Sequence, residues 1–167
     1  AELKRRGLTF RGALYAGLML TPQGPKVLEF NVRLGDPEAQ AILVRLNSDL
    51  GAIFEAVARG RLGGVRADWS DEASACVVLA SRGYPESPQT GDAIKGLDEA
   101  PSDPHVHIFH AGTRRDPTGA WRTAGGRVVG VTATGATLER ALARCYAAAG
   151  RISWDGLHYR RDIGKPA

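Results

Sequence analysis

The chain has 167 residues, 43% hydrophobic and 24% charged, with a formal net charge of +4 at pH 7. This composition is ordinary for a folded globular protein and excludes a wholly disordered chain. The arginines are scattered rather than clustered with aromatic residues, and no apolar run approaches the roughly 20 residues that span a bilayer. We therefore expect no nucleic-acid partner and no membrane partner.

The first part of the chain predicts a hairpin followed by a helix. Residues 11–20 and 26–33 have strand composition, and the Pro- and Gly-containing residues 21–25 between them predict a turn. A helical repeat of apolar residues then runs from Ala39 to Leu46.

The predicted caps follow from residue types at the helix starts. Asp36 is placed to be the N-cap of the first helix, with Pro37 at its first position, where a missing N–H costs nothing. Ser48 is predicted to cap a second helix that stops near Gly60. A polar, Gly-containing link over residues 61–72 follows.

The second part predicts a strand-rich module with one helix. Short β-like runs are followed by a helical repeat that ends at Gly150; these runs are 74–80, 106–111 and 127–132. Cys76 and Cys145 lie far apart in apolar runs, which favours buried thiols over a disulfide and indicates a reducing compartment, the cytoplasm. The predicted fold class is α+β.

The second predicted strand carries an unusual polar row. Because side chains alternate along a strand, one face should hold Leu28, Phe30 and Val32, which we expect in a core. The other face should hold Glu29, Asn31 and Arg33.

Carboxylate and amide oxygens two residues apart suit Mg²⁺, which binds through one or two carboxylates and substrate phosphates. Arg33 could hold a phosphate or carboxylate, and the helix that opens after Gly35 and Asp36 could direct N–H groups at an anion. The alternative is a solvent-facing strand with an incidental ion pair. Spacing alone leaves both interpretations open.

Several blocks resemble one family in order and spacing. The run YAGLML…GPKVLEFNVRLGDPEAQAILVRLNSDL resembles the C-terminal half of the ATP-grasp domain of phosphoribosylamine–glycine ligases. ASACVVLASRGYP, FHAGT, GGRVVGVTATG and DGLHYRRDIG resemble the C-terminal domain of the same enzymes. The resemblance implies the end of an ATP-grasp domain over residues 1–68, and a small strand-rich domain with a packed helix over residues 69–167.

The resemblance also implies an activity. These enzymes join glycine to 5-phosphoribosylamine with ATP, through glycyl phosphate, in de novo purine synthesis, with Mg²⁺ or Mn²⁺. Glu29 and Asn31 match the metal ligands of the family, and Arg33 would steady the transferred phosphoryl group. Gly35 and Asp36 would shape the loop near the substrates, although Asp36 could be only a helix cap.

Met19 lies where ATP-grasp folds often place an apolar residue against adenine, although core packing is the competing interpretation. Many relatives carry an acidic metal ligand on that first strand, and YAGLML has none.

The resemblance covers only the C-terminal part of such an enzyme. The chain begins without Met in what resembles the end of a charged helix, so we expect a missing N-terminal part and no ligase activity from this chain alone. The alternative is a non-catalytic module that binds a partner, or another copy of itself, through an uncovered apolar face. A different ATP-grasp ligase is disfavoured because DPEAQ and YRRDIG fit this family.

Overall fold

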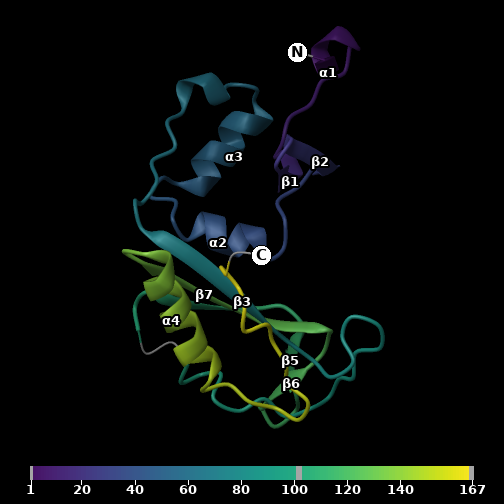
Figure 1. The fold of residues 1–167 in the computed structure, drawn as a ribbon, viewed down its shortest axis with the longest axis vertical. Coiled ribbons are helices and arrows are strands. Elements are labelled where there is room, and N and C mark those ends of the chain that lie inside the picture. The colour runs from purple at the N-terminus through teal and green to yellow at the C-terminus, as the bar shows by residue number, and fades with distance from the viewer. Residues whose placement is uncertain (1, 101–102, 166–167) are drawn as a thin grey trace. The chain divides into compact units, whose positions relative to one another are not determined.

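The computed structural model describes residues 2–100 and 103–165 and has mixed α and β structure, which confirms the predicted α+β class (Figure 1). The elements of the first part are α1 (Glu2–Arg5), β1 (Tyr15–Thr21), β2 (Gly24–Asn31), α2 (Glu38–Leu43), α3 (Leu50–Ala58) and the 3₁₀ turn η1 (Leu62–Gly64). The elements of the second part are β3 (Ala73–Ala80), β4 (Val106–His110), β5 (Thr113–Arg115), β6 (Trp121–Thr123), β7 (Arg127–Gly135) and α4 (Leu138–Ala149).

The chain forms two compact units, and the division falls inside α2. The first unit comprises Ala1–Ala39 and Leu46–Ser70, and the second comprises Gln40–Arg45 and Asp71–Ala167.

The first unit contains the predicted hairpin, with shorter strands than expected. β1 begins at Tyr15, and β2 ends at Asn31, so Arg33 lies beyond the strand. The two strands pair antiparallel, with Tyr15 opposite Asn31 and Gly17 opposite Glu29. The register then shifts, because the next pair is Leu18 with Val27, so β2 has one extra residue at this bulge.

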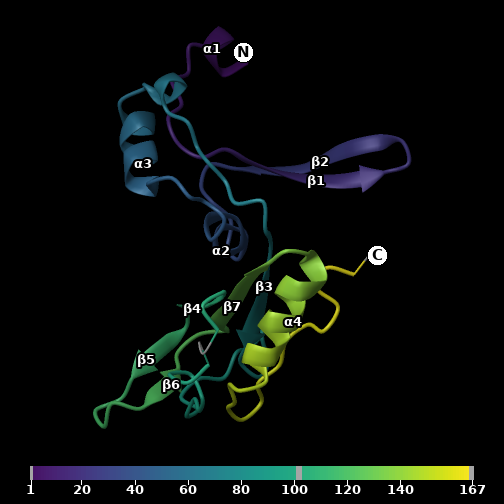
Figure 2. The same ribbon diagram turned by 90° about the vertical axis from the view of Figure 1, so that its left-hand side faces the viewer.

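The apolar face predicted to lie in a core is exposed instead. Leu28, Phe30 and Val32 have 64%, 64% and 69% of their surface accessible. The physical reason is the small size of this sheet. Among residues 2–100 and 103–165, β1 and β2 pair only with each other, and a two-stranded ribbon cannot cover its own faces. Figure 2 shows the ribbon extending away from α3 of the same unit.

The starts of α2 and α3 differ from those predicted from the sequence. α2 begins at Glu38, so Pro37 precedes the helix rather than opening it, and Leu46 pairs with Trp69 outside the helix. Asp49, not Ser48, caps α3, because its side chain accepts a hydrogen bond from the Ala52 N–H.

Ser48 instead bonds the link that follows α3. Its hydroxyl accepts from the Asp68 N–H at 2.8 Å and donates to the Arg66 carbonyl oxygen at 3.4 Å. The polar, Gly-containing link predicted over residues 61–72 therefore folds back on residues 46–48.

The second unit has a three-stranded antiparallel sheet in the order β3-β7-β4, and α4 packs on β3 and β7 (Figure 1). All residues of the central strand β7 after Arg127 are buried. The largest side chains of the core with no exposed surface include Val77, Leu79, Val129, Val131 and Cys145. The predicted burial of Cys145 is confirmed, and Cys76 is half-buried.

A small hairpin, β5–β6, was not predicted because its strands have only three residues each. Trp121 anchors it: its indole N–H donates to Asp98, and the Arg115 guanidinium lies 4.2 Å from the ring centroid. In the described part of the chain, no helix has the length and apolar character needed to cross a membrane.

Candidate functional site

Glu29 and Asn31 lie on one face near the end of β2. The Asn31 side-chain N–H donates a hydrogen bond to Glu29 Oε1 at 2.9 Å. This bond uses the nitrogen end of the amide, so Asn31 Oδ1 and Glu29 Oε2 remain as two oxygen acceptors on the same face. Glu29 is exposed and Asn31 half-buried.

The neighbouring strand leaves room for this pair. Glu29 is opposite Gly17, and a Cβ added at Gly17 would lie 3.1 Å from Glu29 Cγ. Residues directly opposite in an antiparallel pair project from the same face. Alternation along β1 places Met19 on this face too, so Met19 shares it with Glu29 and Asn31.

Arg33 and Asp36 follow the strand in an irregular segment and are both exposed. The Arg33 guanidinium donates to the carbonyl oxygen of Leu34 at 3.2 Å. Gly35 is buried, and its backbone carbonyl accepts from the Ala39 N–H at 2.9 Å. The carboxylate over Gly35 belongs to Glu38: a Cβ at Gly35 would collide with it.

Two residues missed by the sequence analysis join this group. The Tyr15 hydroxyl donates to Glu38 Oε1 in a long hydrogen bond of 3.4 Å. Tyr15 is the cross-strand partner of Asn31. The hairpin register was the missing signal, because a residue's partner is known only once the turn and the bulge are placed.

The residues present fit part of a divalent cation site. Two neighbouring side-chain oxygens match the ligand type that Mg²⁺ and Mn²⁺ take from proteins. Among residues 2–100 and 103–165, however, no group of three or more His, Cys, Asp or Glu side chains gathers in a metal-binding arrangement. Glu29 and Asn31 can thus supply two ligands, and a complete shell needs oxygens from elsewhere.

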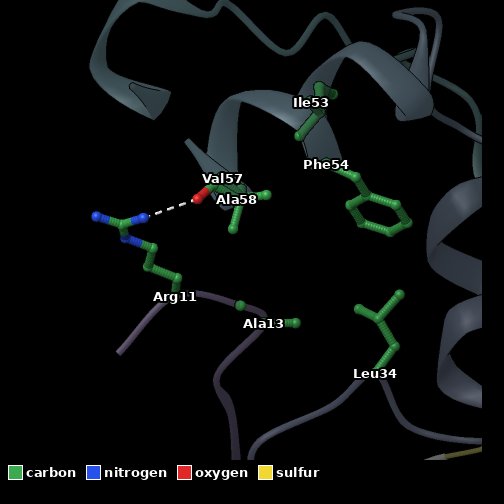
Figure 3. A pocket seen from close by; sticks show the side chains of 8 residues that line it. Arg11, Ala13, Leu34, Ile53, Phe54, Val57 and Ala58 are labelled. Carbon is green, nitrogen blue, oxygen red and sulfur yellow. Dashed lines mark hydrogen bonds between the residues drawn. The ribbon is translucent and has the colours of Figure 1, made fainter. Parts of the chain in front are cut away.

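An apolar pocket of about 550 Å³ lies in the same unit (Figure 3). Leu34 and Phe54 point toward each other across it, and Arg11 closes one side by donating to the Ala58 carbonyl oxygen at 2.9 Å. Met19 is not among its lining residues. The predicted adenine contact of Met19 therefore concerns the open hairpin face rather than this pocket.

Three of the four histidines, which all lie in the second unit, have separate neighbours. His105 Nδ1 lies 3.3 Å from the Thr134 hydroxyl, and His110 Nδ1 lies 2.9 Å from the Thr113 hydroxyl. The His107 ring stacks near Phe109. These contacts give each ring a structural role.

Comparison with sequence families matches both parts of the chain. Residues 1–39 match "Phosphoribosylglycinamide synthetase, ATP-grasp (A) domain", and residues 74–166 match "Phosphoribosylglycinamide synthetase, C domain". Glu29, Asn31 and Arg33 all fall in the first match.

Comparison with individual proteins gives the same family. The phosphoribosylamine–glycine ligase of Streptomyces coelicolor is 50% identical over 99% of this chain, which spans 40% of that protein. The chloroplastic ligase of Arabidopsis thaliana is 47% identical over 97% of this chain and 31% of its own length. The chain therefore spans less than half the length of these relatives.

Solved structures agree at the level of the fold. The crystal structure of the phosphoribosylamine–glycine ligase of Thermotoga maritima superposes with a TM-score of 0.78 and 38% identity, over 96% of this chain and 39% of that one. The biotin carboxylase subunit of pyruvate carboxylase is only 13% identical, with a TM-score of 0.62, over 96% of this chain and 38% of that one. This second likeness is one of fold alone.

Proposed function

Because the chain belongs to the phosphoribosylglycinamide synthetase family, we propose that it is part of an enzyme that joins glycine to 5-phosphoribosylamine with ATP, in purine synthesis. The observation that carries this proposal is the hydrogen-bonded Glu29–Asn31 pair, which lies within the match to the ATP-grasp domain. Residues 1–68 would be the end of that domain, and residues 69–167 the C-terminal domain.

The chemistry proceeds in two steps. An oxygen of the glycine carboxylate attacks the γ-phosphorus of ATP, ADP leaves, and glycyl phosphate forms. The amine nitrogen of phosphoribosylamine then attacks the acyl carbon, phosphate leaves, and glycinamide ribonucleotide forms with loss of a proton. The first step brings a carboxylate toward a polyanion, so it depends on positive charge held at the phosphates.

The residues of the hairpin face match these needs. Glu29 and Asn31 would hold Mg²⁺ or Mn²⁺, which supplies charge neutralisation at the ATP phosphates when bound. Arg33 would steady the transferred phosphoryl group, since an exposed guanidinium beyond the strand can bind phosphate bidentately. Met19, on the same face as the pair, would contact adenine.

Gly35 and Asp36 would shape the loop near the substrates. Gly35 does this by leaving space for the Glu38 carboxylate, whereas Asp36 precedes α2 with an exposed side chain that can reach a substrate. The whole reaction would take place in the cytoplasm.

The chain alone should be inactive. It spans 40% of the Streptomyces relative, and Glu29 and Asn31 supply only two oxygens of a cation shell. A segment corresponding to the N-terminal part of the relatives would complete the site.

A second candidate function rests on the exposed hairpin. Leu18, Leu20 and Phe30 are large, apolar and more than half exposed, and such patches commonly mark interaction surfaces. A chain without the remaining parts of a ligase would then act as a module that binds a partner or a second copy of itself.

One experiment separates the two candidates. ATP-dependent phosphate release with glycine and phosphoribosylamine is measured for three proteins. They are this chain, the same chain extended by the N-terminal part that its relatives have (the restored chain), and the restored chain carrying Glu29→Ala. We expect activity only from the restored chain, and its loss in Glu29→Ala. Glu86→Ala, at an exposed glutamate of the other unit, is the matched control and should remain active. An inactive restored chain, or an active Glu29→Ala variant, would favour the non-catalytic module.

A further inference from the structure

Glu38 is held in place from two sides. It is the first residue of α2 and is half-buried. Its carboxylate occupies the space above Gly35, where any Cβ would collide with it, and its Oε1 accepts from the Tyr15 hydroxyl. A carboxylate enclosed in this way has few orientations, so its position is defined by the fold.

Tyr15 connects this carboxylate to the Glu29–Asn31 pair. Tyr15 is directly opposite Asn31 in the hairpin, and their side chains therefore project from the same face. The phenol is bonded at its far end to Glu38. Asn31 in turn donates to Glu29. Glu38 is thus bonded to Tyr15, Tyr15 lies opposite Asn31 in the hairpin, and Asn31 is bonded to Glu29.

The end of the hairpin needs such support. Asn31 is the last residue of β2, and no third strand pairs with the hairpin in the described part of the chain. A side chain at the end of an uncovered ribbon can rotate, and each freely rotating ligand lowers the affinity of a cation site. Tyr15, opposite Asn31 and bonded at its hydroxyl to Glu38, is the neighbour placed to limit this rotation.

We propose that Glu38 is a positioning residue that acts through Tyr15 to hold Asn31, and with it Glu29, in the orientation that binds the divalent cation. The cation role rests on the proposed function; the positioning of Asn31 does not. In this role Glu38 would not itself bind the cation, because its Oε1 accepts from Tyr15 and its Oε2 lies against Gly35.

The positioning can be tested in the 167-residue chain by NMR of side-chain amides. The chain has only two asparagines, Asn31 and Asn47, so Asn31→Ala identifies the signal. We expect Tyr15→Phe and Glu38→Ala to move the Asn31 amide resonances and bring its two protons toward equal shifts. Glu38→Gln should leave them nearly unchanged, since a carboxamide oxygen also accepts from the tyrosine. If the Asn31 side-chain amide shifts stay the same in Glu38→Ala, the proposal is overturned.

The consequence for the cation is tested in the chain with the N-terminal length restored. Tyr15→Phe and Glu38→Ala should each raise the Mg²⁺ concentration for half-maximal phosphate release about three- to tenfold, the effect of one hydrogen bond. The double variant should need no more Mg²⁺ than either single variant, because both substitutions remove the same Tyr15–Glu38 hydrogen bond. Glu38→Gln should behave like the unsubstituted enzyme.

Two other outcomes would assign Glu38 a different role. If Glu38→Gln is as harmful as Glu38→Ala while Tyr15→Phe is harmless, Glu38 contacts the cation or a substrate directly. If the variants lower only the melting temperature, its role is structural. Either result would reject the positioning role. An inactive unsubstituted enzyme would reject the proposed function instead, and the amide spectrum would still decide whether Glu38 positions Asn31.

Discussion

The side chain of Glu29 lies over Gly17 on the opposite strand, so close that a Cβ at position 17 would be 3.1 Å from Glu29 Cγ. This contact is tighter than ordinary van der Waals distance. A glycine in a strand normally weakens it, and here it allows a close approach. The orientation of the acidic residue of the candidate site therefore depends on a missing side chain in the neighbouring strand.

Substituting Gly17 should impair the candidate site without unfolding the chain. Gly17→Ala needs only a small shift of Glu29, whereas Gly17→Val adds two further methyl groups to that Cβ and forces the Glu29 side chain away. In the restored chain, we expect Gly17→Val to lower phosphate release at least about tenfold, equivalent to ~1.4 kcal/mol, and Gly17→Ala to do so less. Gly63→Ala, where a Cβ meets nothing within 4 Å, is the control. Full activity in Gly17→Val would argue against Glu29 as a ligand.

The exposed apolar face of the hairpin should make the isolated chain self-associate. Leu20 and Phe30 are 82% and 64% exposed, and both lie on the face away from Glu29. Leu20→Lys with Phe30→Lys should reduce the concentration-dependent increase in mass seen by sedimentation. Leu62→Lys, at a leucine 49% exposed outside the hairpin, should change it little. A chain that stays monomeric at high concentration without substitution would contradict this prediction.

The buried thiol of Cys145 should make stability fall at alkaline pH. Burial raises the pKa of Cys145 from 9.0 to about 12, with a smaller contribution from Cys76. The folded state thus keeps a proton that the unfolded chain releases above about pH 9. The contribution to stability is complete below that pH and is lost as the pH rises toward 12, at up to about 1.4 kcal/mol per pH unit.

Urea denaturation of the chain between pH 8 and 10 measures this slope. In Cys145→Ala the decrease should be smaller, because other alkaline groups remain but the thiol does not. Equal slopes in the two proteins would show that the thiol does not titrate as described.

Asp116, in the turn between β5 and β6, should stay ionised in acid. The pKa of this carboxyl is held far below its usual value, first by the Thr118 hydroxyl and then by the Arg122 guanidinium. A lowered folded-state pKa means that its stabilising contribution is present above about pH 4 and is lost as the pH falls below that value. Carboxyl-carbon NMR should find Asp116 ionised at pH 3.

Thr118→Val provides the matched test for Asp116. Without the hydroxyl, the pKa of Asp116 should rise toward the ordinary range, while the bond from Arg122 remains. If Asp116 titrates near pH 4 in the unsubstituted chain, the hydrogen-bonded turn does not persist in solution.

Local patterns were sufficient to predict the main elements of the second unit. The helix from Leu138 to Ala149 and its end at Gly150 follow from apolar spacing and a terminal glycine, because both signals depend only on neighbours in sequence. The strand at β3 also agrees with its predicted span to within one residue. The three-residue strands of β5 and β6 are too short to produce such a signal.

Local sequence patterns did not predict burial or helix capping where these depend on residues distant in the sequence. Leu28, Phe30 and Val32 have the alternation of a core-facing strand, but burial requires another element to cover them, and the described residues provide none. The choice of Asp49 over Ser48 as a cap was decided by the link, which bonds the Ser48 hydroxyl.

The sequence by itself determined the polar alternation of Glu29 and Asn31 and the resemblance to a ligase family, because both depend on residue type and spacing along one strand. Only the tertiary structure decided what lies beside them. Gly17 and Tyr15 reach these residues through the hairpin register, and Glu38 reaches Tyr15 through the segment between β2 and α2. The physical reason is that pairing across strands depends on the turn and the bulge together, and a shift of one residue would send every one of these side chains to the other face.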